Sequence, residues 1–83
     1  MSDFEPAQQK LIECQKTAAL LYSQLMDLTA FTMFTEHDEP NPAKREDIMF
    51  IDDKARMALG HASRVSDTLM IVDHAMADYK KRY

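Results

Sequence analysis

The chain contains few residues that break helices or form covalent cross-links: one Gly, three Pro and one Cys in 83 residues. A single Cys cannot form an internal disulfide, so nothing indicates an oxidising compartment. No apolar stretch approaches the roughly 18 residues needed to span a membrane. The first ten residues also lack the basic segment and apolar run of a secretory signal. These absences predict a soluble, cytoplasmic protein that does not act at a membrane.

The length and charge of the chain narrow its class further. A chain of 83 residues is predicted to form one domain (1–83) with a small core, which self-association commonly supplements. The net charge is -4, with eleven acidic and four basic residues through Asp53 and three acidic and six basic residues from Lys54 onward. This acidic excess argues against nucleic acid as the partner, because nucleic-acid binding requires a basic face.

Apolar residues recur in a seven-residue repeat through both halves of the chain. Spacings that alternate between three and four residues place them on one narrow stripe of a helix, as in a coiled coil. The sequence therefore predicts an all-α fold, an antiparallel and coiled-coil-like two-helix hairpin. The predicted seam consists of Phe4, Ala7, Leu11, Cys14, Ala18, Leu21, Leu25 and Leu28 in the first half, and of Ile48, Ile51, Ala55, Ala58, Ala62, Val65, Leu69, Val72, Met76 and Tyr79 in the second.

Local signals give the predicted bounds of the two helices. The first helix is predicted over about 4–35, after a capping box formed by Ser2 and Glu5. The turn covers about 36–41, since Pro40 prevents regular continuation. The second helix is predicted over about 42–80, because Asn-Pro is a favourable helix start.

The position of the turn predicts a register for the hairpin. If the chain reverses near Glu39 and Pro40, Leu28 faces Ile51 and Leu25 faces Ala55. Large residues then meet small ones, which fills a core without voids. Near the middle, Gly60 adjoins a slim waist, a place where small side chains would let the two helices approach closely. A mid-helix Gly lowers helix stability by about 1 kcal/mol relative to Ala, which suggests that this Gly has a role in packing.

A second apolar stripe lies opposite the predicted seam. A helix that is apolar on two sides is expected to be covered on both. Two interpretations stay open: the core of a homodimeric four-helix bundle, or a binding surface for a different protein, for which flexible Met side chains are well suited. The stripe comprises Ile12, Ala19, Leu20, Met26, Met33 and Phe34, then Met49, Phe50, Met57, Met70 and Ile71.

Residues capable of catalysis or metal binding are few. Cys14 lies on the predicted seam, where a thiol is usually an inert small hydrophobe. His37 stands among acidic residues without the spacing of a zinc or calcium site. His61 and His74 are interpreted as structural or surface residues, and no Glu-x-x-His motif of di-iron bundles is present. Glycine-rich phosphate loops are absent as well. We expect no enzyme activity, no cofactor and no metal.

Two architectural resemblances widen the alternatives. Short helical hairpins with a Pro-containing turn, here Pro40-Asn41-Pro42, are similar to the needle subunits of bacterial type III secretion systems, which implies a self-assembling structural subunit. The predicted bundle also resembles Rop-type RNA-binding bundles, in architecture alone. The cluster Glu46, Asp47, Asp52 and Asp53 instead suggests an acidic mimic of nucleic acid.

The favoured interpretation is a non-catalytic module for protein–protein interaction, of the kind found in small bacterial or phage regulators, inhibitors and adaptors. Its partner is another protein of unknown identity, and a homo-oligomer, above all a dimer, is expected. Recognition would follow the helix-in-groove mode, with neighbouring acidic residues tuning partner choice. The residues predicted to bind the partner are Met26, Met33, Phe34, Met49, Phe50, Met57, Met70 and Ile71.

Overall fold

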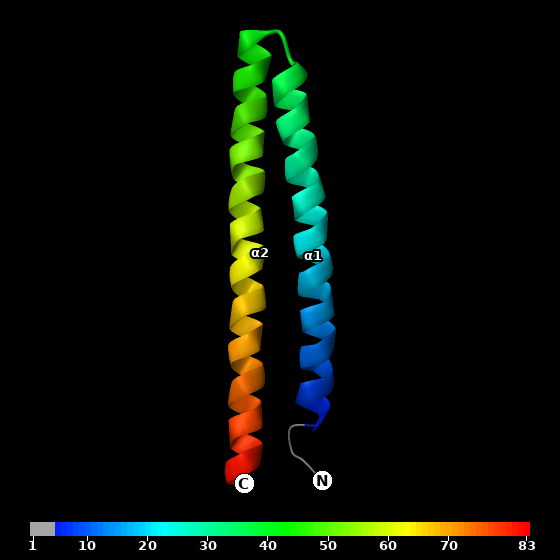
Figure 1. Cartoon of the computed structure of the whole chain (residues 1–83), viewed down its shortest axis with the longest axis vertical. Helices are drawn as coiled ribbons and strands as arrows, with labels where there is room; N and C mark the ends of the chain where they lie inside the picture. Colours follow the sequence, from blue (N-terminus) through cyan, green and yellow to red (C-terminus); the bar gives the residue numbers. More distant parts are fainter. Residues whose placement is uncertain (1–4) are drawn as a thin grey trace.

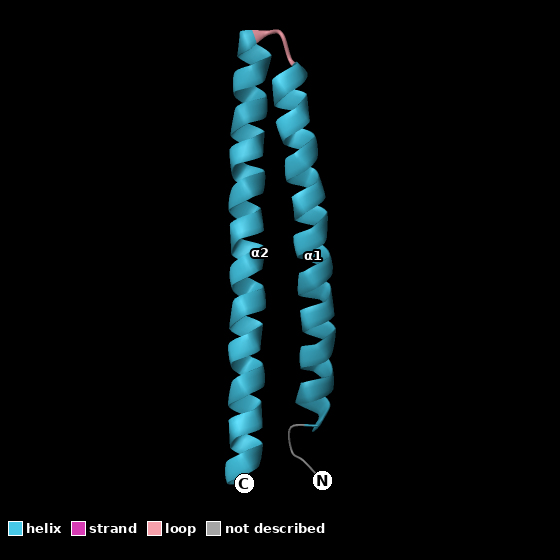
Figure 2. Ribbon diagram, in the orientation of Figure 1, coloured by secondary structure: helices cyan, strands magenta, loops and turns pink. Residues whose placement is uncertain are grey.

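The computed structural model describes residues 5–83, which form two helices, α1 (Glu5–Asp38) and α2 (Pro42–Arg82). The helices lie side by side and antiparallel, so the start of α1 and the end of α2 are at the same end of the molecule (Figure 1). Figure 2 shows helices and one connecting loop, with no strand among the described residues. The Cα trace extends 63 Å along its longest axis. The predicted all-α, two-helix hairpin is confirmed, and the pairing of two hairpins into a four-helix bundle stays a prediction.

The first helix continues three residues beyond its predicted end at 35, and the second ends at Arg82 rather than near 80. Near the end of α1, threonine hydroxyls bond to the helix itself. Thr29 donates to the carbonyl three residues earlier (2.8 Å) and Thr35 to the carbonyl four residues earlier (2.8 Å). The predicted capping residue Ser2 lies outside the described residues.

The turn is closed by the start of α2. The Asn41 side chain accepts hydrogen bonds from the backbone N–H groups of Ala43 (2.9 Å) and Lys44 (3.3 Å). Pro42 follows at the first helical position, where it has no N–H that needs a partner. Arg45 donates from its guanidinium to the Glu39 carbonyl at 2.9 Å, which ties α2 back to the loop.

The seam between the helices keeps the predicted period but differs from the predicted residues at alternate positions. The shared positions are buried at Leu11, Ala18, Ala55 and Ala62. At four other positions, the seam contains the next residue along the chain, which is polar. Gln15 replaces Cys14, Thr29 replaces Leu28, Asp52 replaces Ile51 and Ser66 replaces Val65; Thr29 and Asp52 are buried, and Gln15 and Ser66 are half-buried.

The predicted register is wrong as well. Thr32 hydrogen-bonds to Asp52 across the seam. Steps of seven residues in opposite directions then bring Leu25 opposite Leu59 rather than Ala55. The physical reason is visible in Figure 1, where the first turn of α2 extends beyond the end of α1. The residue at which α1 ends and the residue at which α2 begins are therefore not at the same level.

Candidate interaction surfaces

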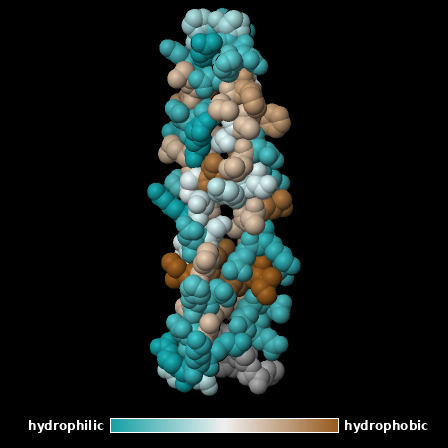
Figure 3. Space-filling view, viewed as in Figure 1, coloured by the Kyte–Doolittle hydropathy of each residue, from teal (hydrophilic) through white to brown (hydrophobic). Residues whose placement is uncertain are grey.

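All eight residues predicted to bind a partner are exposed in the hairpin. Their exposed fractions run from 45% at Met49 to 66% at Ile71. Figure 3 shows apolar side chains on the surface of both helices, separated by polar ones. We call this set the Met face; it consists of Met26, Met33, Phe34, Met49, Phe50, Met57, Met70 and Ile71.

The structure brings six of these eight residues into the half of the hairpin nearer the turn. Met26 and Met33 are one repeat apart on α1, and Met49 lies on the same flank of α2. Phe34, Phe50 and Met57 are one position further round their helices, pointing more outward. Met70 and Ile71 lie in the other half, well away from this group.

Between these two groups, the flank that carries Met26, Met33 and Met49 is lined by smaller residues. A shallow recess of about 290 Å³ is bordered by Ala19 and Tyr22 of α1 and by Ser63, Ser66 and Asp67 of α2. Because Ala19 and Ser63 border the same recess, the side of α1 that bears Ala19 and the side of α2 that bears Ser63 form one flank of the hairpin. The Met face is therefore interrupted at the middle of the molecule.

The opposite flank is an apolar surface that sequence reasoning assigned to the seam. We call it the aliphatic face. Leu21 and Val65 expose 47% and 51% of their surface there, and the thiol of Cys14 is exposed as well. The prediction that these side chains fill the hairpin core is wrong, because the narrower polar residues beside them occupy it. The aliphatic face consists of Cys14, Leu21, Leu28, Ile51, Val65 and Val72.

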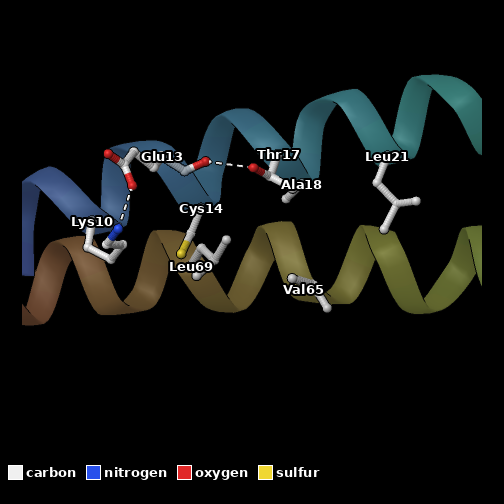
Figure 4. A pocket seen from close by; sticks show the side chains of 8 residues that line it. All are labelled: Lys10, Glu13, Cys14, Thr17, Ala18, Leu21, Val65 and Leu69. Carbon is white, nitrogen blue, oxygen red and sulfur yellow. Dashed lines mark hydrogen bonds and ion pairs between the residues drawn. The ribbon is translucent and has the colours of Figure 1, made fainter.

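A groove of about 490 Å³ runs along the aliphatic face. Figure 4 shows Cys14 and Leu21 directed toward α2, where Val65 and Leu69 complete the wall. Ala18 and Thr17 also line the groove, and the short side chain of Ala18 leaves room within it. An ion pair between Lys10 and Glu13 (2.8 Å) lies at one end.

A polar cluster joins the helices near the turn. One oxygen of Asp52 accepts a hydrogen bond from the Thr32 hydroxyl, and the other accepts one from Arg56 Nε at 2.8 Å. These bonds stabilise the charged carboxylate, so the pKa of Asp52 is below its ordinary value of 3.8, first because of Arg56 and then because of Thr32. The same contact raises the pKa of Arg56. Each partner is satisfied, and the cluster has the character of a structural clamp.

The histidines are not gathered into a reactive site. His37 lies beside Asp38 (3.4 Å) and lines a pocket of about 410 Å³ with Met33, Glu36 and Arg45. His61 and His74 are exposed on α2. Within residues 5–83, no three His, Cys, Asp or Glu side chains are grouped to hold a metal ion. Over the same residues, no helix is long and apolar enough to cross a membrane.

Comparison of this chain with protein-family models, with curated proteins and with solved structures returns no match. Its fold defines it as an all-α helical hairpin.

Proposed function

We propose that this hairpin is a non-catalytic protein–protein interaction module, a regulator, inhibitor or adaptor that binds another protein through the turn-proximal part of the Met face. The carrying observation is the exposure of six large apolar side chains, four of them flexible methionines, in one half of the molecule. Isolated surface apolar residues are common, but a set this dense on a short hairpin is typical of a binding surface. We place this activity in the cytoplasm, since the lone Cys can make no internal disulfide.

The charge around this surface favours a partner helix that carries basic residues. Residues 36–53 include seven acidic and two basic side chains, a local net charge of -5. Glu46 and Asp53 are within one helical turn of Met49, beside the apolar group. An amphipathic helix with an apolar stripe edged by Lys or Arg would complement both the methionines and the acids.

Binding of designed peptides tests this proposal. We expect a Leu/Lys amphipathic helix to bind in fluorescence anisotropy and a Leu/Glu helix of equal length to bind at least tenfold more weakly. The double substitution Met26→Glu and Met57→Glu should weaken Leu/Lys binding tenfold or more, even though it adds acidic charge, because it removes apolar contact.

A matched control carries the same added charge elsewhere. Gln9→Glu with Ala75→Glu changes two exposed residues near the open end of the hairpin and should bind the Leu/Lys peptide as well as the original chain. Equal binding by the original chain and the Met26→Glu, Met57→Glu variant would refute a binding role for the Met face. Dissociation of an oligomer by that variant would instead make the Met face a self-interface.

A self-assembling structural subunit is the second candidate, because apolar side chains are exposed on two opposite flanks of one hairpin. Such an arrangement allows each copy to contact more than one neighbour. Light scattering separates the two candidates: a mass that keeps growing with concentration indicates a polymer, whereas a mass that reaches a plateau indicates a closed assembly with a free surface.

A further inference from the structure

The seam of the hairpin buries polar residues at alternate positions, and an aliphatic stripe beside it is exposed. The seam holds Thr29, Thr32 and Asp52, whereas Leu21 and Val65 are in solvent. Burial of aliphatic surface is the main favourable term in folding and association, at about 25 cal/mol per Å². A repeat of aliphatic side chains that continues along both helices is therefore expected to be covered in the working state of the protein.

The solvent-accessible surface of the chain is large enough to indicate that a large interface covers part of it. The chain exposes 6625 Å², whereas a compact protein of 9.6 kDa exposes about 5,100 Å² by the usual scaling of area with mass. The excess is about 1,500 Å² per chain, or about 3,000 Å² for two chains, which falls within the 2,000–5,000 Å² typical of obligate homodimers. One additional copy is enough to account for it.

We propose that the aliphatic face docks against the same face of a second copy, lying end for end, to form a four-helix bundle. Leu21 is at the middle of α1, and Val65 is within one turn of the middle of α2. A two-fold axis at this level brings Leu21 against its own counterpart. It also sets Leu28 of each copy over the groove beside Cys14 of the other, so one patch is complementary to itself.

The distribution of charge between the two ends of the hairpin favours the end-for-end orientation. At the open end, Lys10 lines the groove together with its ion-pair partner Glu13, so this part of the groove has no net charge. Residues 36–53, beside the turn, have a net charge of -5, whereas residues 66–83, at the open end of α2, include three acidic and three basic residues. Each copy is thus acidic beside the turn and has no net charge at the open end of α2. A turn-to-turn pair would bring two acidic ends together, whereas an end-for-end pair keeps the two acidic ends apart.

This interface goes beyond the proposed function, because it leaves the Met face free for a different protein. The two faces flank the seam on opposite sides, as the recess beside Ala19 and the groove beside Cys14 show. The failure of either proposal therefore leaves the other measurable by its own variants.

Neighbouring leucines provide a matched test of the interface. Leu20 and Leu21 are both exposed, but Leu20 points away from the aliphatic face. We expect light scattering to show a dimer for the original chain and for Leu20→Glu, and at least a tenfold weaker dimer for Leu21→Glu, with helical content checked by circular dichroism. The proposal would be overturned if the original chain is monomeric at a protein concentration 100-fold above about 1 μM. It would also be overturned if both variants weaken the dimer equally.

The native thiol reports the orientation. Cys14 is one repeat from Leu21, so the two thiols of an end-for-end dimer are separated by about 21 Å along the axis. Disulfide formation requires Cα atoms within about 7 Å. Diamide oxidation should leave the original chain uncross-linked on a non-reducing gel. It should cross-link Leu28→Cys, whose added thiol faces Cys14 of the other copy.

Leu20→Cys is the control for collisional cross-linking and should stay mostly monomeric on the same gel. Efficient cross-linking of the original chain through Cys14 would show that the copies lie turn to turn and would overturn the proposed orientation. Absence of cross-linking in Leu28→Cys, with a dimer present by light scattering, would overturn it as well.

Discussion

At the scale of single residues, Asp52 explains how a seam that contains polar residues remains stable. Its side chain is largely buried, yet both oxygens have hydrogen-bond partners, from Thr32 on α1 and Arg56 on its own helix. A buried carboxylate without partners would be costly, and one with partners favours the register that supplies them. Asp52 therefore contributes specificity of pairing between the helices.

Substitution of Asp52 by Asn should lower the free energy of unfolding at neutral pH and should make that free energy depend less on pH in the acidic range. The folded-state pKa of Asp52 is depressed below 3.8, so its stabilisation is present above the unfolded-state pKa and is lost as pH falls through the lower, folded-state value. Urea denaturation from pH 7 to pH 2 should show the curves of the original chain and Asp52→Asn converging below pH 3.8.

Asp53 provides the control for that series. It is the exposed neighbour of Asp52, and Asp53→Asn should follow the original chain at every pH. A constant difference between Asp52→Asn and the original chain down to pH 2 would show that the hydrogen-bonded carboxylate is not the source of the effect.

At the scale of elements, α2 is a long helix with one weak point. Gly60 is exposed in the middle of α2, and a Cβ built there meets no atom within 4 Å. The sequence suggested that this glycine permits close approach at a slim waist, but the seam passes through Ala62 and Leu59 on either side of it. Gly60 does not contribute to packing within the hairpin.

We therefore expect Gly60→Ala to stabilise the protein by about 1 kcal/mol, because alanine has the higher helix propensity and loses less backbone entropy on folding. The measurement is urea denaturation at fixed protein concentration, with Ala75→Gly on the exposed surface of the same helix as the converse change. A loss of stability in Gly60→Ala would indicate that another chain packs against this position.

At the scale of the whole molecule, the hairpin is a thin rod with little interior. Among the described residues, no large side chain is fully buried, and three of the four buried apolar residues are alanines. A core this small provides little stabilisation against the conformational entropy of the chain. Stability is therefore expected to depend on association.

Folding coupled to dimerisation makes the melting temperature depend on concentration. Each tenfold increase in concentration adds about 1.4 kcal/mol, which should raise Tm by about 3–6 °C for a dimer of this size. The measurement is differential scanning calorimetry at protein concentrations from 10-fold below to 10-fold above about 50 μM. Leu21→Glu should melt at a lower temperature that changes little with concentration, and a constant Tm for the original chain would contradict coupled folding.

The secondary structure and the connection between the helices were determined by the sequence itself. Long runs without Gly or Pro predict helices, and Asn41-Pro42 predicts the start of α2, because capping and proline geometry act locally. The seven-residue period was also correctly predicted, since it follows from the helical repeat. These features depend on neighbours within a turn or two along the chain.

Only the tertiary structure decided which side of each helix faces the other. Two adjacent stripes, one containing Leu21 and Leu28 and one containing Thr29 and Thr32, share the same period, and periodicity alone cannot separate them. The apolar stripe was the natural choice for the seam. The hairpin instead pairs stripes in which buried apolar residues such as Ala18 alternate with polar ones, including Asp52, which bonds to Thr32, and it leaves the aliphatic stripe outside. The choice depends on contacts between residues distant in the sequence, and those contacts arise only when the helices pack.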